Sequence, residues 1–388
     1  MALPIAMNKS RLLSLDAFRG FTIASMFLVN NPGDWGQLYP PLEHAAWSGW
    51  TFTDCIFPFF LFIVGISLHI SLHQKLMSGY AQGQLFRQTA KRAFWIFLIG
   101  LTLNLIPSFD FQSVRIPGVL QRIALCTLLA APILIYCGWK WQAIWTGILF
   151  TVYSILMLAV SVPDVDGVWA RGILEPGRDA GAWLDRLLLD GHLWKRAKTW
   201  DPEGVLSSLP AVCSVIFGAW AGRWLSSKQD AATKTAWFFV TGLACLAIGV
   251  VLDTLFMPIN KSLWTPSYSI FMTGWALISF ACFYWLLDGN PSAMLKKSMA
   301  KLCHPFVMYG MNALFLFTLS GLIAKMLGFI HVDQADGTKP SLQAFIYAPI
   351  KALPMNAVNA SLLYAILFNL LMLLIAWAMW KKRWFVKV

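Results

Sequence analysis

Charged side chains are scarce in this chain, and their scarcity decides its class. Only 12% of the 388 residues are Asp, Glu, Lys or Arg, whereas 58% are hydrophobic. Soluble domains carry about 25% charged and about 45–50% apolar residues, so a soluble globular protein is excluded. Because the apolar excess continues along the whole sequence, we predict a single all-α membrane domain over residues 1–388.

Acidic residues are the scarcer charge. Asp and Glu number 18 against 30 Lys and Arg, which leaves a formal net charge of +12. In a soluble protein this excess would indicate a nucleic-acid partner. In a membrane protein, lysines and arginines gather in the cytoplasmic loops. We therefore expect no nucleic-acid partner and expect membrane lipid around the chain.

Several catalytic and metal-binding patterns are absent from the sequence. The seven cysteines form no CxxC pair, and there is no GxSxG motif. Disulfides and a zinc site are therefore not indicated. His69 and His73 have the i, i+4 spacing of two metal ligands, but no third ligand or HExxH glutamate accompanies them. We expect no metal.

A cleavable signal peptide is not expected either. The first apolar stretch contains Asp16 and Arg19, which the core of a signal peptide would not. Charges inside a membrane helix are costly unless paired or placed in a polar cavity. Their i, i+3 spacing lets the two residues pair with each other. A role in holding the site or a phosphate-bearing ligand is the alternative.

Long apolar runs are what the sequence has in abundance. A membrane-spanning helix needs about 20 mostly apolar residues. The fold class that follows is an all-α polytopic membrane protein with about ten transmembrane helices, at 12–31, 52–73, 93–108, 118–137, 141–161, 204–225, 235–257, 268–287, 305–325 and 359–380. The long connections 162–203 and 326–358 are expected on the non-cytoplasmic side. The first contains an amphipathic segment that we expect at the membrane surface, formed by Trp183, Leu184, Leu187 and Leu188.

The distribution of cations predicts that both termini are cytoplasmic. One set of segments carries Lys9, Arg11, Lys75, Arg87, Lys91, Arg92, Lys140, Arg223, Lys228, Lys234, Lys296, Lys297, Lys301, Lys381, Lys382, Arg383 and Lys387. The short connections on the other side, 32–51, 109–117 and 258–267, carry only Arg115 and Lys261. Cations concentrate in cytoplasmic loops, which assigns the first set to the cytoplasm.

Polar and aromatic residues gather in four segments that this topology places at the non-cytoplasmic face. The segments are 30–54, 115–122, 199–207 and 260–268. Such residues at one mouth of an apolar bundle are typical of a site for a polar substrate. His44 stands out among them, because histidine is the natural base near neutral pH and can also carry an acyl group. The alternative for His44 is an ordinary surface histidine.

The ordered set of motifs resembles the heparan-α-glucosaminide N-acetyltransferase family of transmembrane acyltransferases, over nearly the whole chain. The motifs are SLDAFRG at 14–20, Asn30, HAAWSG at 44–49, DCIFP at 54–58, PGVLQR at 117–122, DPEG at 201–204, NKSLWTPSY at 260–268 and GMNA at 310–313. The chain is similar to the bacterial branch, whose members are also labelled N-acetylglucosamine-related transporters. It is expected to lack the N-terminal lumenal region of the lysosomal enzyme.

The resemblance implies an activity and a site. The family acetylates a glucosamine amine with acetyl-CoA supplied from the cytoplasm, so acetyl-CoA is the expected co-substrate and an amino sugar the acceptor. By resemblance His44 and Asn30 are catalytic, His44 as general base or acyl carrier and Asn30 to orient the imidazole or stabilise the oxyanion. The expected substrate-binding residues are Asp16, Arg19, Trp47, Asp54, Gln121, Arg122, Asp201, Glu203, Asn260, Lys261, Trp264, Ser267, Tyr268 and Asn312.

Two other functions stay open at this point. Ten spans can divide into two inverted halves, as in secondary transporters, so transport of N-acetylglucosamine or a related sugar is the alternative. The second alternative is an acyltransferase that acts on another acceptor, such as a peptidoglycan fragment. We expect a multi-pass protein of a bacterial inner membrane, and homodimer formation is left open.

Overall fold

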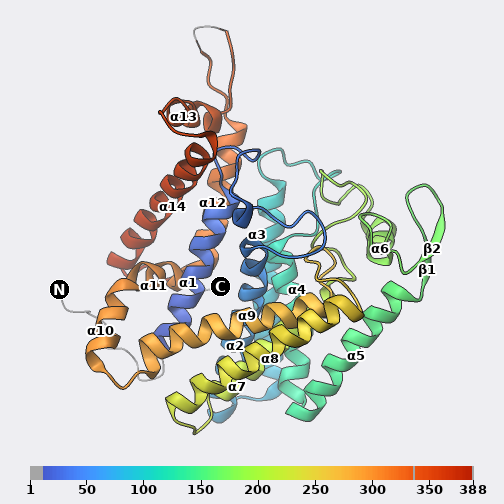
Figure 1. Cartoon of the computed structure of the whole chain (residues 1–388), viewed down its shortest axis with the longest axis vertical. Helices are drawn as coiled ribbons and strands as arrows, with labels where there is room; N and C mark the ends of the chain where they lie inside the picture. Colours follow the sequence, from blue (N-terminus) through green and yellow to red (C-terminus); the bar gives the residue numbers. More distant parts are fainter. Residues whose placement is uncertain (1–11, 335–336, 387–388) are drawn as a thin grey trace.

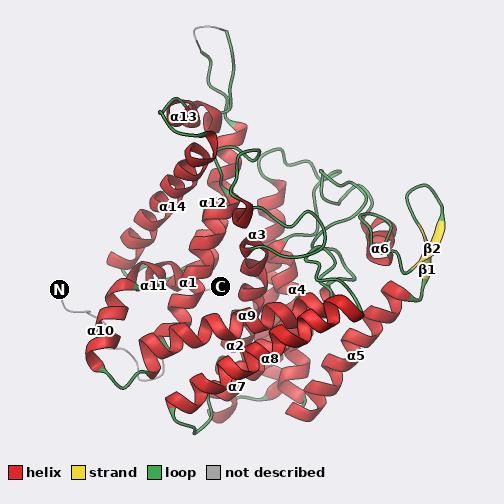
Figure 2. Ribbon diagram, viewed as in Figure 1, coloured by secondary structure: helices red, strands yellow, loops and turns green. Residues whose placement is uncertain are grey.

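The computed structural model describes residues 12–334 and 337–386, which form a bundle of helices with loops gathered at one end (Figures 1 and 2). The α-helices are α1 Leu13–Asn30, α2 Phe52–Met77, α3 Gln82–Leu105, α4 Val119–Tyr136, α5 Trp139–Leu158, α6 Ala180–Leu189, α7 Ser208–Leu225, α8 Ala231–Leu255, α9 Pro266–Tyr284, α10 Ala293–Leu302, α11 His304–Met311, α12 Ala313–Phe329, α13 Leu342–Lys351 and α14 Ala357–Lys381. A 3₁₀ turn η1 covers Pro40–Leu42, and a π-helix η2 covers Trp285–Gly289. The strands β1 Ser161–Pro163 and β2 Trp169–Arg171 pair antiparallel, with Val162 opposite Ala170.

A helix lies at each of the ten predicted spans. Six helices in the described part are long and apolar enough to cross a membrane, namely α2, α4, α5, α8, α9 with η2, and α14. The pair α11 and α12 makes a seventh if it counts as one span. The helices α1, α3 and α7 complete the ten predicted positions without passing that test. A polytopic all-α fold is thus supported, and the count of ten spans stays a prediction.

Two predicted spans differ in shape from the expectation. Residues 305–325 were expected to form one helix, but α11 and α12 meet at Asn312 with a bend of 84°. The helix expected over 93–108 begins at Gln82, because the polar stretch before the apolar run continues the same helix. Both differences have one cause: hydropathy reports the apolar run and neither polar helical extensions nor breaks inside the run.

Burial orders the helices from the centre of the bundle to its surface. In α2, 67% of the most apolar window is buried inside the protein, against 17% in α5 and 22% in α8. α2 therefore lies at the centre of the bundle, and α5 and α8 lie at its surface. At the centre, α2 approaches α7 closely at Gly65 and Gly218, where a Cβ on Gly218 would collide with the backbone of Phe62.

The loops at one end of the bundle are joined to one another by hydrogen bonds. Gly49 donates to the carbonyl of Ile259 at 2.7 Å, and Ile116 donates to that of His192 at 3.0 Å. The indole of Trp47 donates to the carbonyl of Leu174 at 2.7 Å. The four segments expected at one mouth of the bundle therefore do meet at one end, beside α6 and the β1–β2 hairpin (Figure 1).

The two sides of the membrane are assigned from the distribution of cations. Lys9, Arg11 and Lys387, three of the cations used for the topology, lie outside the described residues, as do both ends of the chain. Cytoplasmic termini, outward loops 162–203 and 326–358, and a single domain over 1–388 stay predictions. The amphipathic segment does form a helix, α6, with Leu187 and Leu188 63% and 57% exposed.

Candidate active site

His44 and Asp54 form a histidine–carboxylate pair at the loop end of the bundle. His44 follows η1, and Asp54 lies in the first turn of α2. Their Nδ1 and Oδ1 atoms are 2.7 Å apart, with the His44 side chain 50% exposed and that of Asp54 1% exposed. When Nδ1–H donates to a buried carboxylate, the ring is held in one tautomer and Nε2 keeps its lone pair. His44 thus has the geometry of an oriented base.

Asp54 is itself fixed by the start of α2. Its Oδ2 accepts the backbone N–H of Thr51 at 3.1 Å and that of Ala45 at 3.0 Å. The first contact is half of a capping box, in which a side chain in the first helical turn satisfies the N-cap amide. The second ties the His44 loop to the same carboxylate. One residue therefore starts the helix and positions the imidazole.

Lys261 brings a cation to this pair from the connection between α8 and α9. Its Nζ lies 3.0 Å from Nδ1 and 3.4 Å from Nε2 of His44, and 3.4 Å from Oδ1 of Asp54. Burial lowers the pKa of Lys261 from its ordinary value, and the charges of Asp54 and Glu203 oppose that effect. Lys261, 217 residues from His44 in sequence, thus lies against the His44–Asp54 pair.

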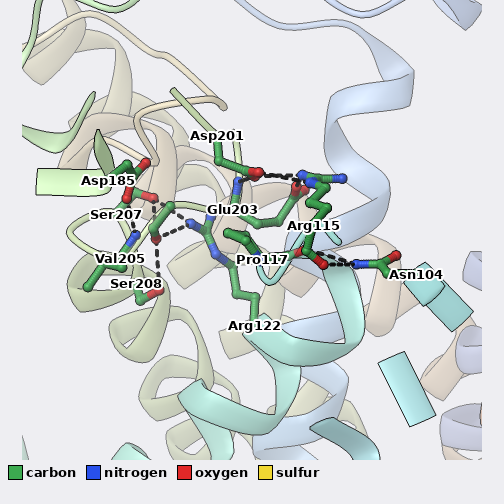
Figure 3. Close-up of polar contacts among 11 residues, drawn as sticks. Asn104, Arg115, Pro117, Arg122, Asp185, Asp201, Glu203, Val205, Ser207 and Ser208 are labelled. Carbon is green, nitrogen blue, oxygen red and sulfur yellow. Dashed lines mark hydrogen bonds and ion pairs between the residues drawn. The ribbon is translucent and has the colours of Figure 1, made fainter. Parts of the chain in front are cut away.

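A second group of charges lies beside the first and is shown in Figure 3. Arg115 binds Asp201 with two N–H donors, at 2.8 and 2.5 Å, and Glu203 with one at 2.5 Å. Bidentate pairs of this kind fix geometry as well as charge. The side-chain amide of Asn104, at the end of α3, donates to the carbonyls of Arg115 and Pro117 and so holds this loop.

The charges in this group perturb one another. Burial is the largest effect on the pKa of Asp201 and raises it, although Arg115 works in the opposite direction. Burial would also raise the pKa of Glu203, but Arg115, Arg122 and Lys261 outweigh it and lower the value. For Arg115, burial alone would lower the pKa, and the two carboxylates raise it. Such mutual perturbation is typical of functional sites and also of structural ion-pair networks.

Arg122 is a buried member of the network. It is 2% exposed, donates from Nη2 to the carbonyl of Gly204 at 2.9 Å and to the hydroxyl of Ser207, and lies 5.4 Å from the ring centre of Trp264. Its Nε and Nη1 have no hydrogen-bond partner within the described ranges. An unmade buried donor costs roughly 1–3 kcal/mol, so these two atoms are the places where water or a ligand oxygen would bind.

Other residues of the predicted set at this end of the bundle support this arrangement. The Tyr268 hydroxyl donates to the backbone carbonyl of Asp54 at 2.7 Å. The Asn260 side chain accepts from the Leu263 amide at 2.9 Å, and Ser267 donates to the carbonyl of Pro258 at 3.1 Å. Trp47 packs edge-on against Trp200, with ring centres 5.1 Å apart.

Asp16 and Arg19 lie far from this cluster. They are on the first two turns of α1, and 14 residues of helix, about 21 Å, separate Asp16 from Asn30 at its other end. They pair at 3.3 Å, as their spacing predicts, and Arg19 also donates to Ser67 at 2.9 Å. Arg19 thus bonds Ser67 of α2 and the carbonyl of Gly310 of α11, so it connects α1 to both helices.

Arg19 also lines a cavity of about 560 Å³ between α1, α2, α3, α4 and the α11–α12 bend. Its other polar lining includes Ser67, Arg92 and Asn312, and the rest is mostly apolar. Asn312 was expected to bind substrate, but its side-chain amide bonds the backbone of Trp384 and Val386, each at 3.0 Å. In this structure Asn312 holds the segment after α14 at the bend.

Asn30 and Gln121 are the predicted residues that the structure leaves without a visible role. Asn30 is exposed at the end of α1, and no hydrogen bond to His44 is found in the part of the chain described. Gln121 is 5% exposed, lies beside Gly100 and Gly118, and its Nε2 has no partner among the described residues. Their predicted roles in catalysis and binding stay predictions.

Sequence reasoning missed two members of the cluster, Arg115 and Asp185. Asp185, on α6, is 2% exposed and accepts the Val205 amide at 2.8 Å. Burial raises its pKa to about 7. Arg115 had a usable signal, since it and Lys261 are the only cations in the short connections 32–51, 109–117 and 258–267. Asp185 had none, because an acid on an amphipathic helix is ordinary.

The cluster can therefore perform acid–base chemistry with electrostatic support. His44 offers an oriented base, Lys261 an adjacent cation, and Arg122 two unused donors. Within residues 12–334 and 337–386, no group of three His, Cys, Asp or Glu side chains is placed to hold a metal ion.

Comparisons with known proteins agree with the resemblance read from the motifs. Residues 11–184 match a family model described as heparan-alpha-glucosaminide N-acetyltransferase, catalytic. The human heparan-alpha-glucosaminide N-acetyltransferase is 28% identical over 333 residues, which cover 72% of this chain and 49% of that protein. The mouse protein of the same name is 28% identical over 332 residues, covering 72% and 50%. The chain spans about half the length of the curated relatives it matches. The resemblance is thus confirmed.

Proposed function

We propose that this chain is a transmembrane acetyltransferase that moves the acetyl group of acetyl-CoA onto the amine of a glucosamine-type sugar. The observation that carries the proposal is the His44–Asp54 pair, whose 2.7 Å contact leaves Nε2 available as a base at a mouth lined with polar residues. The names of the human and mouse relatives supply the reaction class. The acceptor sugar and the bacterial inner membrane as location belong to the proposal.

In the proposed reaction His44 acts as general base and transfer is direct. The acceptor nitrogen attacks the thioester carbonyl carbon, a C–N bond forms, and the carbonyl electron pair moves to oxygen. The carbonyl then re-forms, the C–S bond breaks, and the proton that His44 took from the amine goes to the CoA sulfur. Holding both substrates in one site supplies much of the acceleration. An acetyl-histidine intermediate is the alternative route.

The donor is proposed to enter from the cytoplasmic side through the 560 Å³ cavity. Its mostly apolar walls suit the pantetheine arm, and Arg19 and Arg92 offer charge to a phosphate-bearing ligand. This route would let a donor made inside the cell meet a sugar outside it.

The test is to supply the detergent-purified protein with labelled acetyl-CoA and a panel of amino sugars. Acetylated product, formed without any membrane gradient, is the expected result. Uptake of unmodified N-acetylglucosamine into vesicles without consumption of acetyl-CoA would instead establish the transporter.

Variants of the pair test the assignment of the base. His44→Ala is expected to lower turnover by about 10²–10⁴-fold while acetyl-CoA binding persists, since that is the usual contribution of a positioned base. Asp54→Asn should lower turnover by a similar factor, because the imidazole of His44 loses the charge that orients it. Asn30→Ala should lose about 10²–10³-fold if it binds the oxyanion. Near-wild-type turnover of His44→Ala would show that the cluster is structural.

Acetyl-CoA given without acceptor separates the two routes. A stable acetyl label on His44, located by mass spectrometry, would establish the carrier mechanism. An unlabelled His44 in active protein is the result expected for direct transfer.

A further inference from the structure

We propose that Lys261 is a catalytic residue of this site, whose ammonium group binds the acetyl oxygen as negative charge develops on it during transfer. The inference rests on the proposed function and adds a residue role to it. Lys261 was expected from the sequence only to contact substrate.

The position of Nζ relative to the imidazole is the first argument. Nζ is 3.0 Å from Nδ1 and 3.4 Å from Nε2, so it faces the ring rather than one nitrogen. The Nδ1 contact with Asp54 already occupies one edge of the ring. A substrate carbonyl beside Nε2 would therefore lie within reach of the ammonium, which is where a cation for the oxyanion is needed.

The loop that carries Lys261 is held firmly, which is the second argument. Thr265 donates from its hydroxyl to the carbonyl of Pro258 at 2.7 Å, and its amide donates to that of Asn260 at 3.2 Å. Trp264 adopts a left-handed conformation with φ of 50° although it is 1% exposed. A bulky buried residue keeps such a conformation only where the surroundings enforce it, and such residues cluster at active sites.

The same loop is fastened to the base. The Gly49 amide donates to the carbonyl of Ile259, two residues before Lys261. The Tyr268 hydroxyl bonds the backbone of Asp54, so α9 is tied to α2. Lys261, His44 and Asp54 are thus fixed in one frame, and a preorganised cation needs no reorganisation when charge develops.

Burial restricts the range of pH over which Lys261 is a cation, and the carboxylates that face it oppose this effect. Asp54 and the thiol of Cys55 face it from α2, Glu203 from the loop before α7, and His44 from its own loop. Burial lowers the pKa of Lys261 from 10.5, and the two carboxylates oppose this. Lys261 keeps its proton throughout the reaction, so the C–N and C–S steps and the proton carried by His44 balance without it.

A merely structural ion pair with Asp54 is the competing explanation, and three variants separate the two. Lys261→Met removes the charge and keeps the length of the side chain. Lys261→Arg keeps the charge with a different donor geometry. Lys339→Met is the matched control, because Lys339 pairs with Asp333 at 2.8 Å but is 71% exposed. Turnover, acetyl-CoA affinity and thermal unfolding are measured for each.

The proposal expects a loss of turnover that is separate from binding and folding. Lys261→Met should lose about 10²–10³-fold in kcat while acetyl-CoA affinity stays close to wild type and the protein stays folded at the assay temperature. Lys261→Arg should recover part of the loss, and Lys339→Met should match wild type. Near-wild-type turnover of Lys261→Met would overturn the proposal, as would a folded, acetyl-CoA-binding Lys261→Arg with no activity.

The pH profile gives a readout that an ion pair alone would not move, and it decides the matter if Lys261→Met does not fold. A protonated Lys261 is required, so wild-type activity should fall at alkaline pH as the lysine loses its proton. Arginine stays charged there, so the alkaline limb of Lys261→Arg should shift upward. An identical alkaline limb in both proteins would refute the role. If the wild-type protein transfers no acetyl group, the proposed function itself is refuted.

Discussion

At the residue scale, Asp185 combines deep burial with a nearby carboxylate and a backbone contact. Its oxygen accepts the Val205 amide, and the charges of Asp201 and Asp179 add to the effect of burial. Its pKa rises from 3.8 to about 7. Asp179, the N-cap of α6, shifts the same way, to about 6. These acids favour their neutral forms in the folded protein.

The consequence is a stability that depends on pH. A carboxyl with a raised folded-state pKa stabilises the fold fully below its unfolded value, and that contribution is lost as pH rises through the folded value. Stability should therefore fall between about pH 4 and pH 7, by about 1.4 kcal/mol per unit of pKa shift. Asp185→Asn should flatten the dependence of the unfolding temperature on pH, measured by differential scanning fluorimetry in detergent.

Asp190→Asn is the matched control for this prediction, because Asp190 follows the same helix and is exposed. It should leave the pH dependence unchanged. A wild-type unfolding temperature that does not decline from pH 5 to pH 8 would contradict the assignment of a neutral Asp185.

At the element scale, the contact between α2 and α7 depends on glycine. A Cβ on Gly218 would fall against the backbone of Phe62, which cannot move aside as a side chain could. Gly218→Ala should therefore force the helices apart and destabilise the protein by about 1–3 kcal/mol, the usual range for overpacking. The measurement is the unfolding temperature together with monodispersity on size exclusion.

Gly147 provides the comparison within the same protein. It lies in α5, is exposed, and a Cβ there meets nothing within 4 Å. Gly147→Ala should be neutral or slightly stabilising, because alanine has the higher helix propensity. Equal behaviour of the two variants would mean that α2 and α7 do not pack this closely.

The elements show what hydropathy can predict and where it stops. Long apolar runs located a helix at every predicted span, since backbone groups in a membrane must be satisfied within the helix. The same signal missed the bend at Asn312 and the polar first half of α3. It also missed α10 and α13, short helices of ten residues each outside any long apolar run. Amphipathic periodicity recovered α6.

The pairings inside the site could not be read from the sequence. The polarity of the motifs predicted that their loops gather at one end of the bundle. In the structure these loops are in contact at that end. The contact of Lys261 with His44 spans 217 residues of chain, and no periodicity encodes it. Asp16, Arg19 and Asn312 lie outside this cluster, where Arg19 bonds the carbonyl of Gly310 and Asn312 bonds that of Trp384, and their predicted roles in binding stay predictions.

At the scale of the whole molecule, the distribution of cations predicts its orientation. A reporter fused after Val388 should read cytoplasmic, and one inserted within 170–180 should read non-cytoplasmic, because lysines and arginines concentrate on the cytoplasmic side. Paired alkaline phosphatase and fluorescent protein fusions make the measurement. The reverse pattern would reverse the sides proposed for donor and acceptor.

The order of the charges along the chain has a consequence for how the protein is made. Arg115 leaves the ribosome well before Asp201 and Glu203, and His44 and Asp54 long before Lys261. The part that matches the family model ends at residue 184, so it holds His44 and Asp54 but not Asp201, Glu203 or Lys261. Until Lys261 is synthesised, Asp54 of the nascent chain lacks the cation that lies 3.4 Å from it in the folded protein. The ion pairs of the site can therefore form only once translation has passed Lys261 in this chain of 388 residues.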